Sequence, residues 1–330
     1  SFPTRRSSDL VGQAYGDLGK YSLQLKYLKN ALRIGENKLG TNHPVTVNIL
    51  EELGDAYGNL GKYSQLLEYS QRTLAIKKQI YGPDHWKLAK TLCDIGNAYF
   101  LLCKFDQSLE YSKKSLAIYE KSDIPRPLAI AANLHALGHA YEGLGKYDQQ
   151  LMYYKRALKI RERHLAADHP SISKTFHEMG RAYGNLGEFD KQLESLQKAL
   201  KIKKRQFSAD HPDVAISLHA IGIAHGNLGN LDKQLESLQL VQKLYNKAYD
   251  SDHPNVAMIF RDIGQAYGSL GKFDQQLQSL QRALRIHQKA KAPNQIAIAA
   301  ILHCLGVTYG NLGDYRQQLK YLEDARNIYE

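Results

Sequence analysis

The chain has 330 residues, of which 43% are hydrophobic, and it carries a formal net charge of +11. It contains no run of about 18 consecutive apolar residues, which excludes an ordinary membrane-spanning helix and gives no reason to expect a membrane partner. Its three cysteines, Cys93, Cys103 and Cys304, are odd in number and lack the spacing of metal ligands. We therefore expect a reducing, cytoplasmic location without a zinc site. The excess of lysine and arginine raises the question of an acidic partner.

The first ten residues, SFPTRRSSDL, fit no part of the periodic pattern that begins at residue 11. They lack the apolar segment of a secretory signal, and they resemble an in-frame translation of a sequencing adapter. We interpret residues 1–10 as a non-native scar, the alternative being an ordinary disordered N-terminus.

At the other end the chain stops at NIYE, inside a predicted helix with no polar capping helix after it. We expect the repeat to be truncated at both ends, with self-association through the uncapped ends.

The rest of the chain repeats with a period of 42 residues. Each period has a glycine followed three residues later by tyrosine or histidine, as in LGDAYGNLGKY. The repeat glycines are Gly12, Gly54, Gly96, Gly138, Gly180, Gly222, Gly264 and Gly306. Eight units without an insertion predict a solenoid, in which stacked repeats share one continuous core.

The fifth unit shows two amphipathic helices. Apolar residues recur every three or four positions over 172–186 and again over 189–200, which is the spacing of one helix face. Gly187 lies between them, where a helix would stop. The following loop, ADHP, ends in Pro212, which suits the first turn of the next helix. We interpret the loop histidines as structural: His43, His85, His169, His211 and His253.

The motif aromatic/Leu–x–x–Leu–Gly–x–x–Tyr, then Gly–Lys–Tyr, then Ala–Leu resembles a tetratricopeptide repeat. The 42-residue period with DHP loops, as in GKYDQQLMYYKRALKIRERHLAADHP, resembles the kinesin light chain type of that repeat. The resemblance implies an all-α fold, a right-handed α-solenoid (superhelix) of eight tandem helix-turn-helix repeats. We expect a single solenoid over residues 11–330, with units that start near residues 11, 46, 88, 130, 172, 214, 256 and 298. It also implies that the first helix of each repeat lines a concave groove.

Three columns of residues on the predicted first helices vary from repeat to repeat, whereas the core columns are nearly uniform. They lie six and three residues before the repeat glycine and one residue after it. Such variation is what a binding face would show, although tolerant surface positions would vary as well. The predicted partner-binding residues are Asn48, Glu51, Asp55, Lys90, Cys93, Asn97, His135, His139, Lys174, His177, Arg181, His219, Arg261, Gln265 and His303.

The charge of the predicted groove changes along the chain. Units 2 and 3 are acidic, and units 4 to 6 are rich in histidine. With the flanking positions included, the predicted groove contains eight acidic residues and four basic ones. The basic residues are Lys90, Lys174, Arg181 and Arg261. Kinesin light chains, which this chain resembles, take acidic-aromatic peptides in a basic groove, and this groove does not clearly copy that one. A bound segment with opposite charges at its two ends would fit.

Two further glycine patterns concern the packing of the helices. Six units carry a second glycine, at Gly16, Gly58, Gly184, Gly226, Gly268 and Gly310. We interpret it as a tightened helix end or as a point of close approach for a ligand backbone. We expect the first glycine to make room for the residue, usually glutamine, that lies early in the second helix, as at Gln192.

No catalytic constellation or phosphate-binding loop is recognisable, so we expect neither enzymatic activity nor a cofactor. His135 and His139, four residues apart, could supply two metal ligands, but no third is evident, and we expect no metal site.

The leading hypothesis is a protein–protein interaction scaffold or adaptor that binds an extended or helical partner segment in the groove. One alternative is the sensor or targeting arm of a larger protein with a separate effector domain. Nucleic-acid binding by the basic outer surface is the less favoured alternative.

Overall fold

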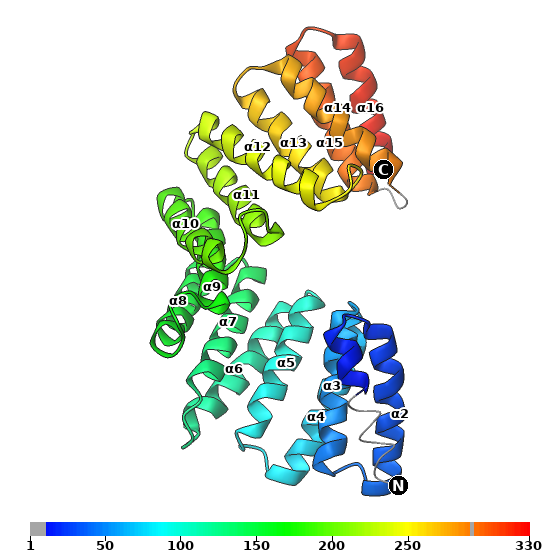
Figure 1. Ribbon diagram of the computed structural model, residues 1–330, viewed down its shortest axis with the longest axis vertical. Coiled ribbons are helices and arrows are strands. Elements are labelled where there is room, and N and C mark those ends of the chain that lie inside the picture. The colour runs from blue at the N-terminus through cyan, green and yellow to red at the C-terminus, as the bar shows by residue number, and fades with distance from the viewer. Residues whose placement is uncertain (1–10, 291–293) are drawn as a thin grey trace. The chain divides into compact units, whose positions relative to one another are not determined.

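The computed structural model describes residues 11–290 and 294–330, and every regular element in these two stretches is a helix (Figure 1). Residues 11–17 are helical. The helices that follow are α2 (Tyr21–Leu39), α3 (Pro44–Asn59), α4 (Tyr63–Tyr81), α5 (Lys87–Leu101), α6 (Phe105–Lys121), α7 (Pro127–Gly143), α8 (Tyr147–His164), α9 (Pro170–Asn185), α10 (Phe189–Gln206), α11 (Pro212–Asn227), α12 (Leu231–Ala248), α13 (Pro254–Ser269), α14 (Phe273–Lys289), α15 (Gln295–Asn311) and α16 (Tyr315–Tyr329). The predicted all-α class is confirmed for this part of the chain. Residues 1–10 lie outside it, so their interpretation as a scar stays a prediction.

Consecutive helices pack as pairs, one pair per repeat. The two helices of a repeat contact each other most extensively, and the second helix of one repeat packs on the first helix of the next, as α10 does on α11. The chain divides into two compact units, an N-terminal unit that ends at Leu165 and a C-terminal unit of Ala166–Glu330. Each unit is a stack of helix pairs, as expected of an α-solenoid. That both units form one continuous solenoid stays a prediction.

The loop histidines begin the first helices. At α9, for example, the Nδ1 of His169 accepts a 3.1 Å hydrogen bond from the N–H of Ser171, and Pro170 occupies the first helical position. His43, His211 and His253 accept equivalent bonds at the starts of α3, α11 and α13. A side chain that accepts from the first orphaned N–H groups stabilises a helix start. The structural role predicted for these histidines is confirmed.

Two first helices of the N-terminal unit begin without the usual histidine–proline pair. Trp86 precedes α5, and the guanidinium of Arg126, which precedes α7, lies 3.3 Å from the centroid of the Trp86 ring. The ring of His85 also stacks against that of Trp86, with centroids 5.5 Å apart. Cation–π and stacking contacts of this kind are attractive, so they connect the two loops. The Nδ1 of His85 still accepts a 3.2 Å hydrogen bond from the N–H of Lys87, as the other loop histidines do.

The turn within each repeat requires a left-handed residue. Seven of these turns have a glycine with φ between 67° and 81° at this position, for example Gly187 with φ 74°. In the third repeat the position is taken by Cys103, with φ 56°. It is the only non-glycine residue with positive φ in the described chain, and its side chain is exposed. An L-residue is strained in this region of backbone space.

The repeat glycines lie where two helices touch. Gly54 faces Leu66, the early residue of the second helix, as predicted, but in most repeats the partner is a different residue. A Cβ at Gly180 would come within 2.8 Å of the side chain of Leu196, rather than meeting the side chain of Gln192. It is the second glycine that makes room for the glutamine, because a Cβ at Gly184 would lie 2.6 Å from Gln192 Nε2. Neither of our interpretations of the second glycine included this packing. The volume exchange we predicted therefore exists, four residues later in the helix.

Candidate functional site

The first helices of the C-terminal unit carry three pockets, and neighbouring pockets share lining residues. The Lys203 pocket, of about 350 Å³, lies among α9, the end of α10 and the start of α11. The α9–α11 pocket has a volume of about 380 Å³. The α11–α13 pocket has a volume of about 390 Å³. We call the surface that holds these three pockets the pocket face.

The α9–α11 and α11–α13 pockets are built alike, one repeat apart. Asn185 of the first pocket and Asn227 of the second occupy the same repeat position, at the end of a first helix. Ile223 lines both pockets and is 42% exposed. The N-terminal unit has a counterpart of about 290 Å³, lined by Gln13, Asp55, Asn59 and their neighbours. The pockets thus recur in register with the sequence repeat.

The back of the α9–α11 pocket depends on the second glycine. Gln192 reaches into the pocket over Gly184, and its Oε1 accepts a 3.2 Å hydrogen bond from Asn227 Nδ2. The glutamine of one repeat therefore orients the asparagine of the next. A larger residue at position 184 would displace Gln192 and with it this bond.

Three residues of the pocket face, His219, Arg261 and Arg181, are paired with acidic residues next to the predicted columns. His219 Nε2 lies 2.7 Å from Asp262 Oδ2, and Arg261 donates to Asp262 Oδ1 at 2.8 and 3.0 Å. In the neighbouring repeat, Arg181 donates to Glu178 at 3.0 Å. These pairs hold the cationic side chains at the pocket walls.

The Lys203 pocket is lined by Lys174 and His177, which we predicted, and by Lys203, which we did not. Burial lowers the pKa of His177, an effect that Lys203 and Arg181 reinforce and Glu178 opposes. Burial also lowers the pKa of Lys203, although the nearby carboxylates act in the other direction. The Nδ1 of His177 is buried and has no hydrogen-bond partner among the described residues. The pocket therefore combines cationic donors with an unpartnered imidazole nitrogen in a partly desolvated place.

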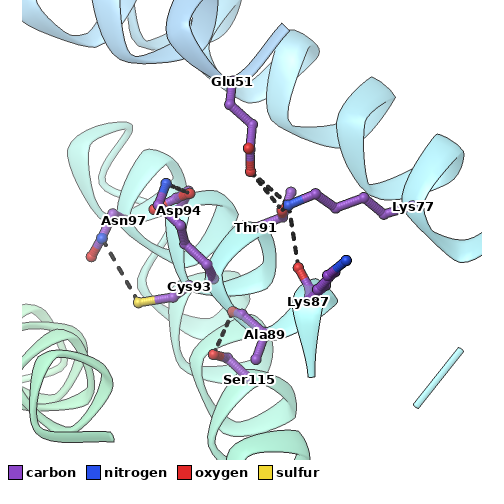
Figure 2. Close-up of polar contacts among 10 residues, drawn as sticks. Glu51, Lys77, Lys87, Ala89, Thr91, Cys93, Asp94, Asn97 and Ser115 are labelled. Carbon is purple, nitrogen blue, oxygen red and sulfur yellow. Dashed lines mark hydrogen bonds and ion pairs between the residues drawn. The ribbon is translucent and has the colours of Figure 1, made fainter. Parts of the chain in front are cut away.

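In the N-terminal unit the equivalent region is closed by an internal ion pair. Glu51 on α3 accepts a 2.6 Å hydrogen bond from the ammonium of Lys77 on α4 (Figure 2). The same ammonium donates to the hydroxyl of Thr91 at 3.0 Å and to the carbonyl of Lys87 at 3.2 Å. Glu51 thus has its counterion inside the fold.

Lys90 and its acidic neighbours form a second charged cluster on the first helices of the N-terminal unit. Lys90 Nζ donates to Asp94 Oδ2 at 2.8 Å. Burial acts to lower the pKa of Lys90, but Asp94, Asp55 and Glu51 raise it more, and the net shift is upward. Burial raises the pKa of Asp94 and of Asp55, while Lys90 lowers both.

Three other predicted residues of this unit, Cys93, His135 and His139, are half-buried or buried. Burial raises the pKa of the Cys93 thiol to about 12, and Asn97 Nδ2 lies 4.0 Å from its sulfur (Figure 2). His135 is only 6% exposed and packs edge-on against His139, with ring centroids 4.7 Å apart. His139 Nδ1 lies 3.1 Å from the hydroxyl of Tyr154. These side chains are engaged with each other rather than facing a pocket.

The structure gathers part of the predicted set. Lys174, His177, Arg181, His219, Arg261 and Gln265 line the pocket face, and Asp55 lines the pocket of the N-terminal unit. The other predicted residues line none of these four pockets: Asn48, Glu51, Lys90, Cys93, Asn97, His135, His139 and His303. Sequence reasoning missed Asn185, Asn227 and Lys203. The recurring GNLG motif was a usable signal for the asparagines, but our interpretation concerned only its two glycines.

No helix within residues 11–290 and 294–330 has both the length and the apolar character needed to cross a membrane.

Comparisons with known proteins agree with this architecture. Two family profiles, both described as tetratricopeptide repeat, match the chain, one at residues 48–121, 129–205, 171–233 and 221–289 and the other at residues 5–45 and 298–330. No curated protein matches the chain significantly.

Several solved structures share the fold. Nearly identical TPR-like repeats of a kinesin light chain candidate from Podosopora anserina are 23% identical, over 62% of this chain and 97% of theirs, with a TM-score of 0.55. The apo form of the quorum sensor NprR from B. thuringiensis is 13% identical, over 99% of this chain and 87% of its own, with a TM-score of 0.75. A signal transduction ATPase with numerous domains from Pyrococcus horikoshii, which has a tetratricopeptide repeat sensor, is 14% identical, over 98% of this chain and 47% of its own, with a TM-score of 0.71.

Proposed function

The chain belongs to the tetratricopeptide repeat family, and on that premise we propose that it is a non-enzymatic interaction scaffold or adaptor of the cytoplasm. Its ligand is a segment of a partner protein, bound along the pocket face of the C-terminal unit. The observation that carries the proposal is the recurrence of one pocket in register with the repeat, at α9–α11 and again at α11–α13. A compact ligand needs one pocket, whereas a series of matched pockets suits an elongated one.

The residues of the pocket face suit a peptide. Ile216 and Ile223 are 44% and 42% exposed there and offer apolar contact to side chains. Asn185 and Asn227 recur beside them, and a carboxamide can donate to and accept from a peptide group at the same time. These two asparagines, followed by Ser269 at the same position of the next repeat, provide main-chain recognition without a requirement for sequence, while the pockets provide the specificity.

The spacing of the anchors in a bound segment distinguishes an extended ligand from a helical one. Packed helices lie about 8–10 Å apart, and neighbouring pockets, which are one repeat apart, are separated by at least about that distance. A polyproline II segment rises about 3.1 Å per residue, which places anchors at least about three residues apart. A helix rises about 1.5 Å per residue, which places them at least about six residues apart.

Selection from a library of random 16-residue peptides displayed on phage, against the full chain, tests the proposal. We expect enriched peptides with two anchors at one of these spacings, and their affinities are then measured by calorimetry. Ile223→Glu should weaken binding at least tenfold. Leu240→Glu is the matched control, because Leu240 is 45% exposed but lies on the second helix α12, outside the pockets. Equal losses in the two variants, or no enriched peptide, would contradict the proposal.

A sensor arm of a larger protein is the second candidate. It is favoured by the two structural neighbours whose descriptions name them as a quorum sensor and a sensor-bearing ATPase. An effector domain encoded in the same complete reading frame would support this function. Nucleic-acid binding is less favoured because basic residues of the second helices are paired with acidic ones, as Lys198 is with Glu194 at 2.6 Å.

A further inference from the structure

Two lysines occupy the same repeat position in the two units and have different neighbours. Lys77 lies in α4 and Lys203 lies in α10, three repeats later. Each donates a 3.2 Å hydrogen bond to a main-chain carbonyl at the start of the next first helix, that of Lys87 or that of Asp213. The two ammonium groups are therefore placed alike, and their surroundings can be compared position by position.

The charge of Lys77 is neutralised inside the fold. The carboxylate of Glu51 lies 2.6 Å from the ammonium, and the hydroxyl of Thr91 accepts from it at 3.0 Å (Figure 2). The Lys77 side chain is only 9% exposed. A buried ammonium needs such partners because desolvation of an unpaired charge is costly.

Lys203 lacks this counterion. The position of Glu51 is taken by His177, and that of Thr91 by Ser217, whose hydroxyl lies 3.3 Å from the Asp213 carbonyl. Among the described residues, no carboxylate lies within ion-pairing distance of the Lys203 ammonium, which bonds only to a main-chain carbonyl. The space beside Lys203 is instead the open pocket of about 350 Å³.

We propose that the Lys203 pocket is a subsite for one carboxylate of the partner segment, which takes the place beside Lys203 that Glu51 holds beside Lys77. The carboxylate comes from an aspartate, a glutamate or a C-terminus of the bound segment. This inference rests on the proposed function, since it assigns the chemistry of one anchor of that segment.

The donors and the acidic neighbours of the pocket together favour a monoanion. Lys203 and Lys174 provide two ammonium groups, and the buried Nδ1 of His177 provides an unused third position. Charge-assisted hydrogen bonds to a carboxylate are about twice as strong as neutral ones. Glu178 and Asp213 lie near enough to act electrostatically on Lys203, and they would repel a doubly charged phosphate more than a carboxylate.

The first experiment uses small anions and the full chain. The imidazole signals of His177 are followed by NMR while sodium acetate or inorganic phosphate replaces sodium chloride at constant ionic strength. We expect a saturable shift with acetate, and an acetate affinity at least tenfold lower in Lys203→Met. Lys198→Gln is the matched control, because Lys198 is exposed and already paired with Glu194, and its affinity should equal that of the wild type. No saturable shift, an undiminished response in Lys203→Met, or a response to phosphate alone overturns the proposal.

The second experiment exchanges the two sites. His177→Glu gives Lys203 an internal counterion like the one that Lys77 has. The ion pair of Glu51 and Lys77 shows that a glutamate at this position of the repeat is compatible with the fold. We expect this variant to melt at a higher temperature and to lose the acetate response of the Lys203 amide. Glu51→His should create an acetate response at the Lys77 amide. Undiminished acetate binding by His177→Glu overturns the proposal.

The two proposals fail in different ways because the anion titration uses no peptide. If selected peptides bind the pocket face but acetate does not bind beside Lys203, the subsite is wrong and the proposed function stands. If acetate binds but no peptide is enriched, the proposed function is wrong and the anion site remains.

Discussion

The ring of the fully buried Tyr154 lies so close over Gly138 that a Cβ at residue 138 would overlap it. Gly54 occupies the same position in another repeat and has more room. A Cβ there would lie 3.5 Å from Leu66 and 3.7 Å from Ser70, which is ordinary van der Waals contact. The same sequence position is therefore under different steric constraints in two repeats.

Substitution of these two glycines by alanine should have effects of opposite sign. Alanine favours a helix over glycine by about 1 kcal/mol, so Gly54→Ala should raise the free energy of unfolding by up to roughly that amount. In Gly138→Ala the same gain is outweighed by overpacking against a rigid ring, which costs about 1–3 kcal/mol. Urea denaturation followed by circular dichroism measures both. Stabilisation by both substitutions would show that Tyr154 can move aside.

Cys103 offers a direct test of backbone strain. Its φ of 56° lies in the left-handed region, where the other repeats have glycine. Cys103→Gly should stabilise the N-terminal unit by about 0.5–1 kcal/mol, because relief of the strain exceeds the entropy lost by a glycine on folding. Cys103→Ala is the control, since alanine keeps the strained conformation and should bring no gain. Urea denaturation followed by the fluorescence of Trp86, the sole tryptophan, reports on this unit.

The histidine caps can be tested at α9, where His169 Nδ1 accepts from the N–H of Ser171. His169→Ala should cost about 1 kcal/mol, as is typical for loss of an N-cap acceptor. His169→Asn should retain most of the stability, because asparagine is a good N-cap, and Asn294 already caps α15 in this chain by accepting from the N–H of Ala297. Hydrogen exchange of the Ser171 amide is the second measurement, and it should accelerate in His169→Ala only.

The period of the sequence was enough to predict the helix pairs and the position of the turns, because helix periodicity, glycine and proline act over a few residues. It was not enough to predict which residue faces each glycine, since Gln192 and Leu196 are one turn apart on the same helix and the register of two packed helices decides between them. The candidate site shows the same limit. Glu51 and His177 occupied one column in the sequence, but only the structure shows that Lys77 and Lys203 stand behind them.

Acid should destabilise the C-terminal unit through His177. Burial is the main cause that lowers the pKa of this imidazole, with Lys203 and Arg181 adding to the shift and Glu178 opposing it. An unfolded chain binds the proton near pH 6.5, the ordinary value, whereas the folded chain binds it only at lower pH. Between these two values the unfolded state holds more protons, so the free energy of unfolding falls as the pH falls below about 6.5.

His177→Gln removes this contribution, because glutamine does not titrate. Urea denaturation followed by circular dichroism at pH 7.5, 6.5 and 5.5 should show a smaller loss of stability on acidification in His177→Gln than in the wild type. His303→Gln is the matched control, since His303 is exposed on α15, and its pH profile should follow the wild type. The Trp86 signal from the N-terminal unit should show the same pH dependence in all three proteins. Parallel profiles for wild type and His177→Gln would mean that the imidazole is solvated well enough to accept its proton in the folded chain.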